Sequence, residues 1–392
     1  MPFEKVSTMD QRTRFIGDYL SHRYTHAGLC SAYGISRPTG YKWIARYEAE
    51  GPAGLIERSR RPHRCPQATD PEVVGAIVEL RKRFRDWGPK KLLRHLSNEF
   101  SKDRLPAEST CSAILTRHGL VDKRRRKKRI SHPGDQSSSV TGPNQLWTAD
   151  YKGQFKTRDG YYCYPLTVLD SYSRYLLGCQ ALSSTCMAPA KQVFTRLFKQ
   201  YGLPDRILTD NGVPFSTFSL GRLSQLSAWW VRLGIEPRLI EPGKPQQNGR
   251  HERFHKTLKA KTVRPPAGNR SAQQRRFNRF KVEYNEIRPH ESLELETPAS
   301  VYAPSSRPFP ARPPRLEYPG HWEIRKVKSS RVMSWKGNDV RVSLPCAGQY
   351  VGLEEIYDGI WDVYLGPVKL GIFVEEQLQI IDHTEAMGIQ KV

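Results

Sequence analysis

The sequence predicts a multidomain protein with basic α-helical domains first, a mixed α/β core next and a small all-β barrel at the end. Three observations support this order. Short helical patterns separated by Gly and Pro fill residues 1–121. Strand patterns rich in aromatic and aliphatic residues precede and then alternate with amphipathic helices over residues 144–303. After a Pro-rich stretch, residues 321–385 hold only short strand patterns and turns, which is typical of a small barrel.

The net charge of +24 over 392 residues indicates a polyanionic partner. Lys and Arg contacts with phosphates release counterions, so this excess favours nucleic acid over a basic surface that is merely solvated. Seven scattered Cys without a CxxC pair argue against a disulfide framework and suit a reducing compartment. Because the sequence has neither a long apolar run nor a signal-peptide pattern, we expect a cytoplasmic protein that makes no membrane contact.

Residues 1–62 show a helix-turn-helix pattern, with helices expected at 10–23, 27–33 and 37–48. Pro38 suits the first turn of the third helix, which would enter a major groove. That helix would present three basic residues to DNA: Arg37, Lys42 and Arg46. Residues 67–121 repeat the three-helix pattern, and we interpret them as a second helix-turn-helix-like domain, although a plain helical bundle fits the same pattern.

A basic linker is expected over residues 122–143, and a Pro-rich linker over residues 304–320. The first contains an unbroken run of cations, which like-charge repulsion should keep extended until phosphates neutralise it. These expected DNA contacts are Lys123, Arg124, Arg125, Arg126, Lys127, Lys128 and Arg129.

The α/β core carries three segments with acids in chemically informative places. Leu146–Asp150 is a strand pattern that ends in an Asp, and Ile207–Asp210 is another, followed by an Asn-Gly turn. The third segment, residues 242–259, reads as a loop leading into a basic helix that holds Glu252. Strand ends and a facing helix can bring three carboxylates to one point, where hard oxygen ligands favour Mg²⁺ or Mn²⁺. Two such ions would support an in-line displacement at a phosphodiester.

These segments, TDNG followed by PQQNGRHER, resemble the DDE transposase and integrase superfamily, above all the integrase-like transposases of bacterial insertion sequences. The likeness extends through YN…RPH…L…TPA at residues 284–299. It implies a ribonuclease-H-like fold for residues 144–303. It also implies that Asp150, Asp210 and Glu252 are the catalytic ligands of two Mg²⁺ or Mn²⁺ ions. The interval of 41 residues between Asp210 and Glu252 is longer than the 35 often found in the family.

Basic residues surround the third acid. Lys256 and Lys259 follow Glu252 at helical spacing, so we expect them to hold DNA phosphates beside it, as an alternative to a solvated salt-bridged face. Arg250 is expected to contact DNA as well. We also expect contacts with phosphate or the leaving strand from some of Arg250, His251 and His255.

Other conspicuous residues receive structural interpretations. Asp170 is interpreted as a turn-forming residue and not as a metal ligand. Trp43 and Trp147 are interpreted as core aromatics. His22, His26 and Cys30 share helical spacing, but no further Cys or His pair nearby completes a zinc site, so zinc is not expected.

The resemblance implies a transposase that binds the terminal inverted repeats of a mobile element, exposes 3′-hydroxyls and joins them to target DNA. Joining two ends implies at least a dimer, and a bacterial source would imply association with the nucleoid. Two alternatives stay open: a transposase-derived DNA-binding regulator without catalysis, and a nuclease on the same fold. The presence of all three acids weakens the first, and the tandem helix-turn-helix pattern weakens the second.

Overall fold

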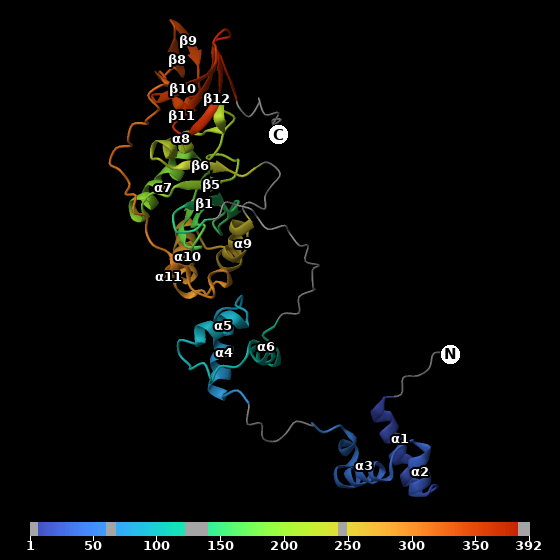
Figure 1. Ribbon diagram of the computed structural model, residues 1–392. Coiled ribbons are helices and arrows are strands. Elements are labelled where there is room, and N and C mark those ends of the chain that lie inside the picture. The colour runs from blue at the N-terminus through green and yellow to red at the C-terminus, as the bar shows by residue number, and fades with distance from the viewer. Residues whose placement is uncertain (1–6, 60–67, 122–139, 242–248, 383–392) are drawn as a thin grey trace. The chain divides into compact units, whose positions relative to one another are not determined.

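A computed structural model describes residues 7–59, 68–121, 140–241 and 249–382. The chain divides into two units, Met1–Ala68 and Thr69–Val392 (Figure 1). The basic run at residues 123–129 lies outside the described residues. Within the described part, none of the helices combines the length and the apolar character that crossing a membrane requires.

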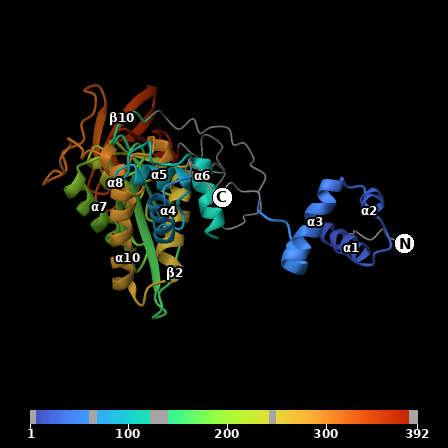
Figure 2. The same cartoon turned by 90° about the horizontal axis from the view of Figure 1, so that it is seen from below.

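The first unit is a three-helix bundle (Figure 2). Its helices are α1 (Thr8–Leu20), α2 (His26–Ala32) and α3 (Arg37–Glu50), followed by a short 3₁₀ turn, Gly51–Leu55. The predicted helices are therefore confirmed, with shifts of at most three residues at their ends. Gly40 permits the close approach of α3 to α2, because a Cβ there would lie 2.5 Å from the Cys30 sulfur. Trp43 is buried in this bundle, as predicted for a core aromatic.

The second unit begins with three more helices, α4 (Pro71–Arg83), α5 (Pro89–Leu96) and α6 (Glu108–Arg117). Asp70 caps α4 by accepting from the Glu72 N–H at 2.9 Å. The helices enclose an apolar core in which Trp87 is fully buried, stacked on Phe84 with ring centroids 4.1 Å apart. Both predicted helical regions are thus confirmed as packed helical structures.

The central sheet is mixed, in the order β4–β3–β1–β5–β6, with β2 paired to the start of β3. β1 runs antiparallel to β3 but parallel to β5, and β5 is parallel to β6. The strands are β1 (Leu146–Tyr151), β2 (Phe155–Lys156), β3 (Tyr162–Asp170), β4 (Leu176–Leu182), β5 (Arg206–Thr209) and β6 (Glu236–Leu239). This arrangement confirms the mixed α/β core.

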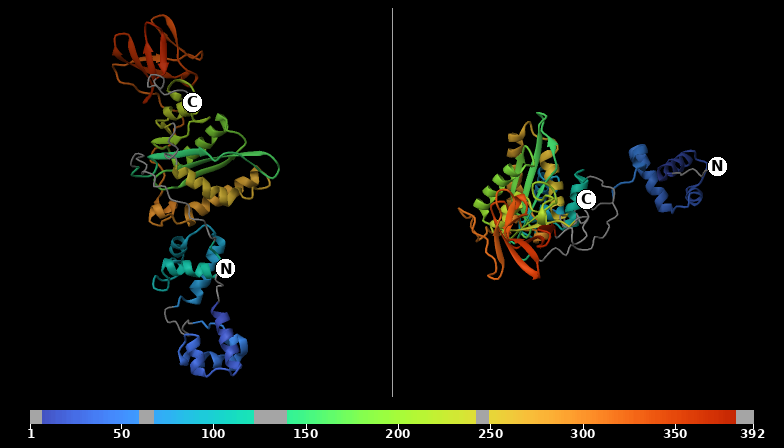
Figure 3. Two further views of the ribbon diagram at one scale, coloured as in Figure 1. Left: turned by 90° about the vertical axis from the view of Figure 1, so that its right-hand side faces the viewer. Right: turned by 90° about the horizontal axis from the view of Figure 1, so that it is seen from above.

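Helices cover both faces of this sheet (Figure 3). α7 (Met187–Tyr201) and α8 (Gln225–Arg232) share one apolar cluster with the sheet. α9 (Gly249–Leu258) and α10 (Arg270–Val282) share another cluster on the opposite face. The structure adds α10, which the sequence analysis did not predict.

The sequence pattern of residues 219–233 predicts one continuous helix, but this prediction is wrong in its first turns, because α8 begins only at Gln225. Gly221 adopts a positive φ of 62°, which interrupts the helical backbone. A Cβ at Gly221 would also lie 2.9 Å from the Lys369 carbonyl oxygen. Close packing against the C-terminal domain therefore requires a turn where the sequence pattern indicated a helix.

The C-terminal domain is all-β, as predicted. A five-stranded antiparallel sheet, β13–β12–β11–β10–β7, and a two-stranded sheet, β8–β9, enclose one apolar core that also includes side chains of α8. The strands are β7 (Glu323–Lys326), β8 (Val332–Trp335), β9 (Asn338–Arg341), β10 (Tyr350–Tyr357), β11 (Ile360–Leu365), β12 (Val368–Val374) and β13 (Gln379–Asp382). Strand β13 was not predicted.

Candidate active site

Two of the predicted acids stand side by side at the ends of parallel strands. The β1–β5 register pairs Ala149 with Thr209, so Asp150 and Asp210 are the next residues of neighbouring strands. Asp210 starts a turn in which the Gly212 N–H donates to its Oδ1 at 3.3 Å. Asn211 anchors the same turn by donating from Nδ2 to the Ile240 carbonyl at 2.9 Å. Local hydrogen bonds therefore fix the direction in which the Asp210 carboxylate leaves the sheet.

The third predicted acid, Glu252, lies in the first turn of α9 and is exposed. The pKa of Asp150 is raised to about 7. Burial is the largest cause, and the negative charges of Asp210 and Glu252 contribute to the same shift. Burial also raises the pKa of Asp210. The structure thus brings Asp150 and Asp210 together and places Glu252 close enough to act on Asp150 electrostatically. Crowded carboxylates of this kind are stabilised by a bound cation.

The carboxylates of Asp150, Asp210 and Glu252 offer oxygen, the ligand type that Mg²⁺ and Mn²⁺ prefer. Among the described residues, however, the one trio whose potential ligand atoms all lie within 4.8 Å of one another is Asp150, His251 and His255. That trio is less suited to Mg²⁺, because imidazole favours softer metals and both ring nitrogens of His251 are already hydrogen-bonded.

A buried network of two histidines and two threonines supports the strand that carries Asp150. The Thr167 hydroxyl donates to the Asp150 carbonyl oxygen at 3.0 Å. Because a hydroxyl has one proton, its lone pairs must then accept from Nε2 of His251 at 2.7 Å and of His255 at 2.8 Å. This assigns the proton of each imidazole to Nε2. Nδ1 of His251 is left to accept from the Thr148 hydroxyl at 2.9 Å.

The same network corrects one expectation. His251 and His255 are 1% and 6% exposed, so neither faces solvent where a DNA phosphate could reach it. Burial lowers the pKa of His251 well below its usual value and that of His255 to about 3, so both imidazoles are neutral at pH 7. Their spacing of four residues, shared with the apolar face of Phe254 and Leu258, was the signal in the sequence for a buried role.

The remaining predicted residues that the structure describes lie on two helices, α9 and α3. Arg250, Lys256 and Lys259 are exposed on or just after α9, where they can meet a ligand. Arg37 and Lys42 are exposed on α3, whereas Arg46 is half-buried with its guanidinium 5.1 Å from the Trp43 ring centroid.

Asp170 is a buried turn residue, as predicted. Its Oδ1 accepts from the Asn144 N–H at 2.8 Å, and its Oδ2 accepts from the N–H and the hydroxyl of Ser173 at 2.8 and 2.6 Å. These bonds occupy the carboxylate and leave it no role as a metal ligand. Trp147 is fully buried and donates from Nε1 to Asn144, which confirms it as a core aromatic.

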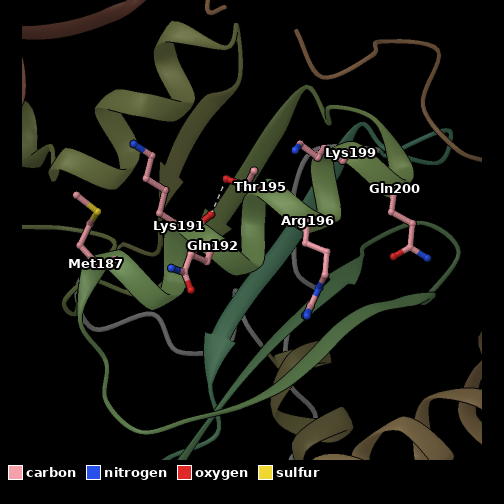
Figure 4. A pocket seen from close by; sticks show the side chains of 8 residues that line it. Met187, Lys191, Gln192, Thr195, Arg196, Lys199 and Gln200 are labelled. Atoms are coloured by element: carbon pink, nitrogen blue, oxygen red, sulfur yellow. Dashed lines mark hydrogen bonds between the residues drawn. The ribbon is translucent and has the colours of Figure 1, made fainter. Parts of the chain in front are cut away.

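A cavity of 850 Å³ lies along the outward face of α7 and not at the acids (Figure 4). Lys191, Arg196 and Lys199 project from this face. Arg196 donates to Gln180 at 2.6 Å, and the Lys191 ammonium lies 5.3 Å from the Trp229 ring centroid. Among the described residues that line it there is no carboxylate, so this groove offers no ligands for a hard cation.

Comparison with known families agrees with this geometry. Family models described as "Integrase core domain" match residues 140–245 and 233–298. Models described as "Helix-turn-helix domain" and "Homeodomain-like domain" match residues 11–63 and 39–115. The chain therefore resembles an integrase core domain over residues 140–298 and helix-turn-helix domains over residues 11–115.

Two proteins of bacterial insertion elements are similar to this chain. The uncharacterized 39.2 kDa protein of insertion element IS476 from Xanthomonas euvesicatoria is 27% identical over 64% of this chain and 70% of that protein. The uncharacterized 31.7 kDa protein of IS407 from Burkholderia multivorans is 25% identical over 59% of this chain and 81% of that protein. A chain of the simian T-cell lymphotropic virus intasome is 16% identical, with a TM-score of 0.37 over 75% of this chain and 97% of its own length.

Proposed function

We propose that this protein is a DNA transposase that binds the terminal inverted repeats of a mobile element, cleaves to expose 3′-hydroxyls and joins them to target DNA. The observation that carries the proposal is the group of carboxylates around Asp150. Asp150 and Asp210 lie at the ends of adjacent parallel strands, and the charge of Glu252 on α9 acts on Asp150. Carboxylates gathered in this way on an integrase core domain suit metal-dependent phosphoryl transfer.

Each acid has a stated role in this proposal. Asp150, Asp210 and Glu252 would hold two Mg²⁺ or Mn²⁺ ions. When bound, such ions supply positive charge that activates an attacking oxygen and steadies the leaving oxygen. Thr167 keeps the Asp150 strand in place through its bond to the Asp150 carbonyl. Lys256 and Lys259 would bind the DNA backbone beside the reacting phosphodiester.

The rest of the chain would bind and position DNA. We propose helix-turn-helix domains at 1–62 and 67–121, a basic linker at 122–143, the catalytic core at 144–303, a Pro-rich linker at 304–320 and a β-barrel domain at 321–385. The α3 residues would read the repeat, and Arg250 would contact its backbone. Two element ends held together require at least a dimer, which in a bacterial cell would be associated with the nucleoid.

A strand-transfer assay tests the proposal. Full-length protein would be incubated with labelled DNA of the element's own ends, Mg²⁺ and a target plasmid. We expect Asp150→Asn, Asp210→Asn and Glu252→Gln to abolish joining while still shifting the end DNA in a gel. Asp358 is an exposed carboxylate of the C-terminal domain. The control variant Asp358→Asn removes the same charge and should join DNA ends to the target at the wild-type level.

Two results would contradict the proposal. Joining by Asp150→Asn at the wild-type level would leave a DNA-binding regulator as the better function. Footprints that show no preference for the element's ends over random duplex would instead favour a nuclease on the same fold. Deleting residues 1–132 separates the parts, because the remaining core should keep metal-dependent nicking and lose end recognition.

A further inference from the structure

A second concentration of charge lies on a different side of α9 from Glu252. A cavity of 470 Å³ opens between α5, the β3–β4 turn, α9 and the loop that follows residues 283–287. Its charged lining is entirely basic: Lys91, Arg174, Arg250, Arg253 and Arg288. The rest of its polar lining is neutral and consists of Thr257, Tyr284, Ser292 and His290, whose pKa burial lowers to about 3. A neighbouring cavity of 550 Å³ shares Arg174, Arg250 and Ser292, so these side chains lie between two openings. That second cavity is also lined by Glu294 and by Glu296, which is paired with Arg94.

The cations in this cavity exceed the carboxylates available to them. Arg288 is paired with Asp86. Arg174, Arg250 and Arg253, in contrast, form no salt bridge with any carboxylate in the described part of the chain. Burial lowers the pKa of Arg174 to about 10, and repulsion from Arg250 contributes to the shift. Like charges held this close are stabilised by an anion between them.

Arg174 is held in position before any ligand arrives. It follows the turn that the Asp170 carboxylate closes with Ser173, and its guanidinium donates to the Ser171 carbonyl at 2.6 Å. Arg250 and Arg253 are exposed and lie three residues apart on α9, so they share a helix face. A cation that is fixed in advance loses less conformational entropy when it binds an anion.

The helix α9 thus presents three different surfaces. One, with His251 and His255, packs against the sheet below Asp150. A second carries Glu252 and the exposed Lys256. The third faces the cationic cavity through Arg250, Arg253 and Thr257. The cavity therefore lies about one helix width from Glu252, since an α-helix with side chains is about 10–12 Å across.

We propose that the cationic cavity binds a backbone phosphate of the DNA strand, separate from the phosphodiester at the acids. The guanidinium groups of Arg174, Arg250 and Arg253 would hold that phosphate by donating charge-assisted hydrogen bonds to its oxygens. Lys91 extends the site onto α5, so the same phosphate would also engage the helical region that precedes the core. The inference rests on the proposed function only in taking DNA as the ligand.

The salt dependence of DNA binding tests the site without any chemistry. Full-length protein in EDTA would be titrated with a short duplex of random sequence over a range of KCl concentrations. Each phosphate contact contributes about 0.9 to the slope of log K against log[KCl]. We expect Arg253→Gln and Arg174→Gln each to lower the magnitude of the slope by about 1, and Arg253→Lys to restore it.

A matched control separates the cavity from the general effect of charge. Arg275→Gln removes an exposed arginine of α10 and should leave the slope within error of wild type. If Arg253→Gln and Arg174→Gln both keep the wild-type slope, or if Arg275→Gln lowers it equally, the proposal is wrong. Calorimetric titration with inorganic phosphate is a further test. If phosphate binds tightly while the variants keep the wild-type slope of log K against log[KCl], the cavity binds a free anion and the proposed DNA site is wrong. Since EDTA prevents metal-dependent joining, these outcomes are independent of whether the protein is a transposase.

Discussion

Replacing the most buried of the three acids, Asp150, by Asn should make the metal-free protein more stable at pH 8. The pKa of this carboxyl is raised from 3.8 to about 7, first by burial and then by the charges of Asp210 and Glu252. At about 1.4 kcal/mol for each pH unit, an ionised Asp150 costs the folded state at most about 4 kcal/mol at pH 8. Its side chain is 17% exposed, so solvent screens part of this cost and we expect about 2 kcal/mol.

The effect must depend on pH with a defined sign. A carboxyl whose pKa is higher in the folded state binds more protons when folded, so its contribution to stability is full below pH 3.8 and is lost as the pH rises towards 7. The advantage of Asp150→Asn should therefore be small at pH 4.5 and largest above pH 7. An expected gain of about 2 kcal/mol corresponds to an increase in Tm of roughly 5 °C for a domain of this size.

Scanning calorimetry in EDTA at pH 4.5 and pH 8 measures this change. Asp170→Asn is the matched control, because Asp170 is also a buried Asp but its carboxylate accepts three hydrogen bonds. An amide there would direct its own N–H groups at other donors, so this variant should lower Tm at both pH values. Adding Mg²⁺ should raise the Tm of wild type and not that of Asp150→Asn. A Tm for Asp150→Asn at pH 8 at or below wild type would refute the electrostatic argument.

Three further substitutions test the parts around the site. Thr167→Val leaves two buried imidazoles without an acceptor and should cost about 1–3 kcal/mol, measured by chemical denaturation, while Thr167→Ser should cost less than half of that. Asp86→Asn leaves the buried guanidinium of Arg288 without its carboxylate and should lower the free energy of unfolding by about 2 kcal/mol. We expect faster proteolysis within residues 69–121, and an unchanged cleavage rate there would contradict the importance of this ion pair. Phe373→Ala removes a fully buried ring beside Trp335 and should cost about 3–5 kcal/mol, detected as an earlier transition of Trp fluorescence.

The sequence gives poor guidance where an element depends on partners distant in the chain. Helix α10 is strongly hydrophilic, and only Gln273, Phe277 and Phe280 on it are buried, so its apolar pattern is too sparse to predict the helix. Strand β13 is four residues long and pairs with the edge of β12, a partner that its own short sequence does not indicate. The first turns of the helix expected at 219–233 are lost because Gly221 packs against the C-terminal domain.

By itself the sequence determined the order of the domains, most of the helices and strands, and the local context of Asp150, Asp210 and Glu252, because hydrophobic periodicity and turn residues act within a few positions of the chain. Only the tertiary structure decided that β1 and β5 run side by side, which places Asp150 beside Asp210. Packing of α9 against the sheet likewise decided that His251 and His255 donate to Thr167, which in turn holds the Asp150 carbonyl. A helical sequence specifies which residues share a face, but the surface that each face meets is set by contacts between distant segments.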